Sequence, residues 1–142
     1  MAAKTIFLDS NGWVALLNAR EALHFEANRL WIEFGRLDFS IVLTDWIVAE
    51  TGNSLARTRA RQLFVDSVRK FSGNPQFRFL AVSSDLKQRA LELYAERPDK
   101  TWGLVDCASF IVMRDEGITD VFTTDRHFEQ AGFKCLLPES AL

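Results

Sequence analysis

The sequence is poor in the residues that mark several specialised classes of protein. Its 142 residues include two cysteines, two histidines and three prolines. Cys107 and Cys135 are too few for a disulfide framework and lie in apolar surroundings, so we expect buried free thiols. No CxxC pair is present, and His24 and His127 lie far apart in the sequence. This pattern argues against a structural zinc site.

The sequence also lacks a long apolar run and a strong excess of one charge. Seventeen basic and nineteen acidic residues give a net charge of -2, so any nucleic-acid binding has to come from a local patch. The start, "MAAKTIFLDS", shows no secretory signal, and no run has membrane length. We therefore expect a cytoplasmic protein with no membrane association, folded as a single domain over residues 1–142.

Short apolar segments alternate with helical patterns along the chain. Strands are predicted at residues 5–8, 39–44, 76–82, 119–125 and 133–138. Helices are predicted at residues 10–20, 21–35, 83–97, 104–117 and 126–132, with two more inside 45–73 that are divided at Gly52 or at residues 56–61. This alternation predicts an α/β domain with a mainly parallel central sheet of about five strands flanked by helices.

Acidic residues occupy informative positions in this pattern. Ligands of parallel sheets bind outside the carboxyl ends of the strands, and Asp9 and Asp125 end the first and fourth predicted strands. Glu50 lies on the polar side of its helix, and Asp106 lies in the most hydrophobic helix of the chain. A charged carboxylate there is costly unless it is paired, hydrogen-bonded or bound to a metal.

Each of these acids also has an ordinary structural explanation. Asp9 can cap a helix, Glu50 can be a solvated helix residue and Asp125 can belong to a turn. Asp106 can form a buried salt bridge with an arginine. If the four converge, however, their repulsion calls for a cation. Oxygen ligands suit Mg²⁺ or Mn²⁺, and such sites hydrolyse phosphodiester bonds by activating water, so the four together favour a metal-dependent nuclease.

Four segments carry a family resemblance. They are "FLDSNGW", "VAETGNSLAR", "DKTWGLVDCASFIVM" and "VFTTDRHFEQAGF". In order and rough spacing they resemble the PIN-domain nucleases, most closely the VapC-type toxins of bacterial type II toxin–antitoxin pairs, and the resemblance covers nearly the whole chain. It implies a PIN-like fold in which Asp9, Glu50, Asp106 and Asp125 hold Mg²⁺ or Mn²⁺ and endonucleolytic cleavage of RNA. It also implies a small antitoxin partner and a homodimer.

Further residues lie beside these motifs. The candidates for a supporting role are Ser10, Asn11, Asp99 and Thr124. The family commonly has a serine in a "WSLxD" pattern where this chain has Gly103, which could loosen the helix start or remove a polar contact. Arg57 begins a basic run just after the Glu50 helix, where it is either an RNA phosphate contact or part of a solvated helix face.

Two other functions compete with the nuclease. The first is a PIN-fold interaction module without catalysis, which the loss of an acid would mark, although all four acids are present. The second is a Mg²⁺-dependent phosphotransfer or phosphatase domain with a nucleophilic aspartate at a strand end. Such a domain needs a DxD-type loop or a lysine at a strand end, and "LDSNG" lacks the second acid.

Overall fold

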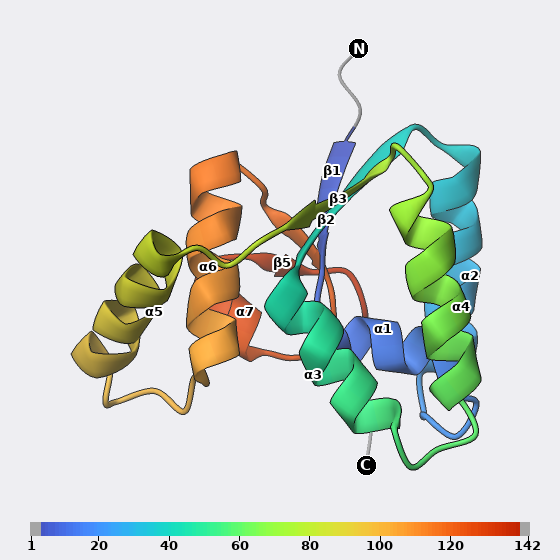
Figure 1. Cartoon of the computed structure of the whole chain (residues 1–142), viewed down its shortest axis with the longest axis horizontal. Helices are drawn as coiled ribbons and strands as arrows, with labels where there is room; N and C mark the ends of the chain where they lie inside the picture. The colour runs from blue at the N-terminus through green and yellow to red at the C-terminus, as the bar shows by residue number, and fades with distance from the viewer. Residues whose placement is uncertain (1–3, 140–142) are drawn as a thin grey trace.

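The computed structural model describes residues 4–139 and contains a central five-stranded sheet (Figure 1). The strand order is β3-β2-β1-β4-β5, and every neighbouring pair is parallel. The predicted α/β fold with a mainly parallel sheet is therefore confirmed. The strands are β1 (Lys4–Leu8), β2 (Phe39–Thr44), β3 (Phe77–Leu80), β4 (Asp120–Phe122) and β5 (Lys134–Cys135).

Helices cover both faces of the sheet. In Figure 1, α2 and α4 lie on one side and α5 and α6 on the other. None of the helices within residues 4–139 is long and apolar enough to cross a membrane. The helices are α1 (Ser10–Leu17), α2 (His24–Arg36), α3 (Asp45–Leu55), α4 (Arg61–Ser72), α5 (Ser84–Glu96), α6 (Leu104–Glu116) and α7 (His127–Gln130).

The core lies around the central strands β1 and β4 and the helix α6. Ile6, Phe7 and Leu8 of β1 are fully buried because a parallel sheet is covered on both faces. Helix α6 is buried continuously from Cys107 to Met113, as its apolar sequence predicts. Cys107 is a buried free thiol, whereas Cys135 is free but only half-buried.

Two predicted helices on either side of residue 20 are shorter than expected. The first ends at Leu17, because the Asn18 side chain accepts a hydrogen bond from the backbone N–H of Arg20 at 3.1 Å and forms a turn instead. The second begins only at His24. The chain therefore leaves α1 in a compact loop.

The long segment 45–73 divides into α3 and α4 at residues 56–60, which is one of the two predicted break points. Gly52 lies inside α3, where it allows close packing on α4. A Cβ atom at Gly52 would lie 2.9 Å from the ring of Phe64. The glycine therefore serves helix packing and does not end the helix.

Three predicted strands are also too long. Strand β3 covers residues 77–80 rather than 76–82, and β5 covers only residues 134–135 rather than 133–138. Both are edge strands of the sheet, which have a hydrogen-bonded neighbour on one side only. Strand β4 ends at Phe122 rather than at residue 125, and its last carbonyl accepts the backbone N–H of Asp9 at 3.4 Å. Residues 123–125 thus form a turn at the carboxyl edge of the sheet.

Candidate active site

Asp9 stands where β1 passes into α1, at the centre of the carboxyl edge of the sheet. It has the extended backbone of a helix N-cap, but its side chain makes no capping hydrogen bond. One carboxylate oxygen instead accepts a hydrogen bond from the Thr123 hydroxyl at 2.7 Å. Asp9 is only 3% exposed. The ordinary explanation of this acid as a helix cap therefore fails.

The structure brings all four predicted acids to one cleft of about 340 Å³. Asp9 follows β1, Glu50 projects from α3, Asp106 lies in the first turn of α6, and Asp125 lies in the turn after β4. Segments far apart in the sequence thus meet at one edge of the sheet, because parallel strands place their carboxyl ends together.

Three of the four predicted supporting residues lie in this region and connect the segments. The Ser10 hydroxyl donates a hydrogen bond to the Glu50 carboxylate, which joins the start of α1 to α3. The Asn11 side-chain oxygen accepts hydrogen bonds from the hydroxyl of Thr124 and from its backbone N–H, the latter at 3.1 Å. These contacts hold α1 against the turn that carries Asp125.

Asp106 and Asp125 share a partner that the sequence analysis missed. The Nδ1 atom of His127 lies 3.2 Å from Oδ2 of Asp106 and 3.4 Å from Oδ1 of Asp125. The three ligand atoms lie within 4.8 Å of one another, so the group has the spacing of a metal site. The signal was the motif "TTDRHF", which places a histidine two residues after Asp125.

Thr123 is the second residue that sequence reasoning missed. Its hydroxyl donates to Asp9 and accepts the backbone N–H of Asp125 at 3.1 Å. Thr123 is fully buried, and these two hydrogen bonds connect Asp9 to the backbone of Asp125. The repeated threonine of "TTD" was the available sign of this role.

The electrostatics of the cleft are those of crowded carboxylates. Burial, reinforced by the charges of Asp106, Asp125 and Glu50, raises the pKa of Asp9 to about 7. Burial also raises the pKa of Asp106, although a hydrogen bond from the Gly103 backbone N–H opposes this change. Within residues 4–139, no lysine or arginine forms an ion pair with any of the four acids.

The residues of the cleft fit a hard divalent cation. Carboxylate oxygens dominate the donor set, and a bound cation would lower the cost of keeping Asp9 and Asp106 ionised. The structure also rules out a salt bridge with an arginine as the explanation of Asp106, because no arginine pairs with it among the described residues.

Gly103 is the N-cap of α6 and supplies no side chain. The Asp106 carboxylate accepts the Gly103 backbone N–H at 2.9 Å, which is one half of a capping box. A serine there would offer the other half. The helix nevertheless begins directly after Gly103, so the structure does not show the looser helix start that the glycine could cause.

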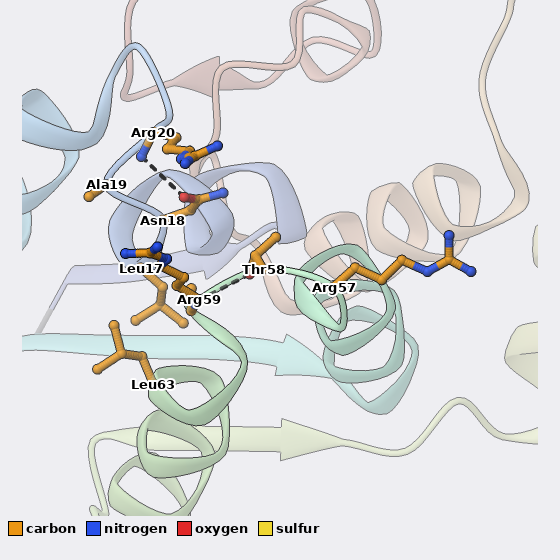
Figure 2. Close-up of a pocket in the computed structure, with 9 residues that line it drawn as sticks. Leu17, Asn18, Ala19, Arg20, Arg57, Thr58, Arg59 and Leu63 are labelled. Atoms are coloured by element: carbon orange, nitrogen blue, oxygen red, sulfur yellow. Dashed lines mark hydrogen bonds between the residues drawn. The ribbon is translucent and has the colours of Figure 1, made fainter.

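Two predicted residues lie outside the cleft. Asp99 is exposed and pairs with Arg97 at 2.9 Å, and this hydrogen-bonded ion pair lowers the pKa of Asp99 to about 2. Arg57 lines a neighbouring pocket, and in Figure 2 its side chain extends away from Arg20 and Arg59. Among the described residues, neither forms an ion pair with any of the four acids or lines the acidic cleft.

Comparison with known proteins identifies the class first. The chain matches the PIN domain over residues 6–134, and it therefore belongs to the PIN-domain family.

Particular relatives narrow this assignment. The chain is 31% identical over 134 residues to the "23S rRNA-specific endonuclease VapC20" of two Mycobacterium tuberculosis strains, CDC 1551 / Oshkosh and H37Rv, covering 94% of this chain and 99% of the relative. The crystal structure of Mycobacterium tuberculosis VapC20, a sarcin-ricin loop cleaving toxin, superposes with a TM-score of 0.80 at 30% identity, over 90% of this chain and 95% of that one. The predicted resemblance to VapC-type proteins is confirmed.

A more distant structure shares the fold alone. VapBC2 from Rickettsia felis, bound to a DNA fragment from its promoter, superposes with a TM-score of 0.63 at 14% identity. The match covers 94% of this chain and 98% of that one.

Proposed function

We propose that this chain is a Mg²⁺- or Mn²⁺-dependent endoribonuclease that acts as the toxin of a VapBC-type pair. The observation that carries the proposal is the convergence of four acids from four separate segments on one cleft without a lysine or arginine partner among the described residues. The similarity to a relative named as an rRNA-specific endonuclease supports the reaction class.

The acids would hold the metal and thereby set the chemistry. We assign Asp9, Asp106, Asp125 and Glu50 as its ligands, on the basis of their common cleft. When bound, a divalent ion activates water and neutralises charge on the phosphodiester.

The other residues of the site would position these ligands. Thr123 fixes Asp9, Ser10 fixes Glu50, and the Gly103 N–H fixes Asp106. Asn11 and Thr124 hold the Asp125 turn against α1. Positioning of this kind reduces the reorganisation that the acids need when substrate binds.

The partners follow from the same proposal. RNA is the substrate, and structured ribosomal RNA is the first to test, because the relative with 31% identity is named for it. The activity would then take place in the cytoplasm, away from any membrane. We also propose a small antitoxin that inhibits the activity, and a homodimeric state. Both are implied by the family resemblance.

A cleavage assay tests the proposal directly. Purified protein, freed of any bound partner, is incubated with ribosomal RNA in Mg²⁺, in Mn²⁺ or in EDTA. Asp9→Asn and Asp106→Asn are compared with Asp38→Asn, which removes an exposed acid outside the cleft. We expect metal-dependent cleavage that falls at least about a thousandfold in the two cleft variants, equal to about 4 kcal/mol of transition-state free energy, and persists in Asp38→Asn.

Other results would point elsewhere. Equal cleavage in EDTA or in folded cleft variants would indicate a contaminating nuclease. Metal binding at the acids without any cleavage would favour the non-catalytic PIN-fold module. Hydrolysis of a phosphate monoester but not of RNA would favour the phosphatase.

A further inference from the structure

A second pocket, of about 520 Å³, lies beside the acidic cleft (Figure 2). Two loops build it: the loop that follows α1, and the loop between α3 and α4. Leu17, Ala60 and Leu63 contribute apolar surface, and Leu63 is 52% exposed although it is a large hydrophobic residue. Asn18 lines both this pocket and the acidic cleft, so the two are adjacent.

Three arginines belong to the lining of the pocket, although the Arg57 side chain extends away from Arg20 and Arg59 in Figure 2. Arg20, Arg57 and Arg59 all line the pocket and are exposed. Within residues 4–139, none of the three forms an ion pair with a carboxylate, whereas Arg29, Arg89 and Arg97 each do. The pocket therefore combines unneutralised positive charge with an apolar floor.

The two loops that carry Arg20 and Arg59 are fixed by their own hydrogen bonds. The Asn18 side chain accepts the backbone N–H of Arg20 at 3.1 Å. In the same way, the Thr58 hydroxyl accepts the backbone N–H of Ala60 at 3.1 Å, which sets the turn around Arg59. The backbones under both guanidinium groups are thus ordered before any ligand binds, which lowers the entropic cost of binding.

The acids of the cleft repel RNA, and the arginines of this pocket can attract it. A polyanionic substrate is repelled by the carboxylates of the cleft, so attraction has to come from cationic groups close by. Resting on the function proposed above, we propose that the pocket binds a nucleotide of single-stranded RNA next to the cleaved phosphodiester. Its phosphates lie on Arg20 and Arg59, and its base or ribose lies on the apolar floor at Leu17 and Leu63.

The alternative occupant is an acidic protein segment, since carboxylates also pair with arginine. RNA is favoured because the pocket borders the cleft through Asn18, and because an apolar floor below cationic groups matches the alternation of base and phosphate in a nucleotide.

Salt dependence of RNA binding provides the test. A labelled short single-stranded RNA is titrated with the full chain in EDTA, where cleavage is blocked, at several salt concentrations. The variant Arg20→Gln/Arg59→Gln is compared with Arg36→Gln/Arg69→Gln, which removes two exposed arginines that lie outside the pocket and form no ion pair within residues 4–139. We expect affinity in the pocket variant to fall about tenfold and the slope of log affinity against log salt to decrease by about 1.4, or about 0.7 for each lost phosphate contact.

Two further readouts complete the design. Leu63→Gln should weaken binding at every salt concentration without a change of slope, because it removes apolar contact and no charge. Equal losses in the pocket variant and in the control variant would overturn the proposal, since they would indicate general attraction by net charge. Unchanged RNA binding with lost binding of a glutamate-rich peptide would also overturn it and assign the pocket to a protein segment.

The outcome separates this inference from the proposed function. If the pocket variant shows metal-dependent cleavage with an unchanged salt slope and an unchanged kcat/KM, the proposed RNA pocket is wrong and the proposed nuclease function stands. If the slope of log RNA affinity against log salt depends on the two arginines but the protein cleaves no RNA with any metal, the nuclease function is wrong and the pocket is an RNA-binding surface.

Discussion

Two neighbouring strands carry a buried aspartate at opposite ends of the sheet. Asp120 begins β4 at the amino edge, and Asp9 follows β1 at the carboxyl edge. They are 5% and 3% exposed, respectively. Asp120 forms an ion pair with Lys4 at 2.7 Å, whereas Asp9 faces Thr123 and three other acids.

The difference indicates what would distinguish a structural acid such as Asp120 from the proposed metal ligand Asp9. Burial alone is the same for both residues, so it cannot decide their roles. At the amino edge the chain supplies its own cation, and the charge is neutralised within the fold. At the carboxyl edge the acids are gathered without a lysine or arginine among the described residues, which leaves the neutralising charge to a ligand.

The largest test of this comparison is the pH dependence of stability without metal. Between the unfolded pKa of 3.8 and the folded pKa of about 7, native Asp9 keeps a proton that the unfolded chain has released. The free energy of unfolding should therefore be highest at low pH and fall as the pH rises through about 7, by on the order of 4 kcal/mol. Asp106 acts in the same direction because its pKa is also raised.

Urea unfolding in EDTA, at constant ionic strength and at about pH 5 and about pH 8, measures the part of this change that falls between these two pH values, on the order of 3 kcal/mol. Asp9→Asn should flatten the dependence and stabilise the protein at the higher pH, whereas Asp120→Asn should keep it. A wild-type protein that becomes more stable between these two pH values would contradict the proposed origin of the shift.

The second test adds a divalent cation. Mn²⁺ or Mg²⁺ at about one hundred times its Kd should stabilise the protein by about 2.7 kcal/mol. The effect should be large at about pH 8 and small at about pH 5, because protons compete with the metal for the carboxylates. Thermal unfolding with and without metal measures it. Asp120→Asn should respond like the wild type and Asp9→Asn should not; equal responses of both variants would place the metal elsewhere.

The third test removes the acid that has its own partner. Asp120→Asn should lower the free energy of unfolding by about 1 kcal/mol, a modest value because the Lys4 side chain is 56% exposed and screened by water. RNA cleavage should remain at the wild-type rate. A double-mutant cycle with Lys4→Gln measures the coupling of the pair, and a loss of cleavage in folded Asp120→Asn would contradict a purely structural role.

The smallest expected effect concerns the start of α6 beside the functional acids. A Cβ atom at Gly103 would meet only the Asp106 carboxylate, at an ordinary 3.7 Å, so Gly103→Ser fits without strain. The serine hydroxyl can complete the capping box and should add a few tenths of a kcal/mol, or about 1–2 °C in Tm. Differential scanning calorimetry measures the shift, and a decrease in Tm would show that the hydroxyl is not accommodated.

Much of the fold was predictable because strong local patterns coincide with the global arrangement. The apolar run before Asp9 predicted a buried strand, and the largely apolar segment around Asp106 predicted a buried helix. The rule that ligands bind at the carboxyl ends of parallel strands then predicted that Asp9 and Asp125, which end two predicted strands, lie at the same edge of the sheet.

The remaining details depend on contacts that the sequence does not encode locally. His127 joins the acids only because the turn after β4 points it back towards α6, and no periodicity reveals this direction. Asp99 pairs with Arg97, two residues before it, and does not line the cleft. A side-chain hydrogen bond of Asn18 also ends α1 early, where helical spacing alone predicted that the helix continues.

The order of strands in the sheet has a consequence for the synthesis and folding of this protein. Strand β4 lies next to β1 in space, yet it is the fourth strand to be synthesised. Asp9 is synthesised well before its neighbour Thr123 and the proposed ligand Asp125, which follow much later in the chain. A growing chain therefore holds an incomplete acidic cluster until β4 has been inserted beside β1, so the cluster is completed only by a contact between segments far apart in the sequence.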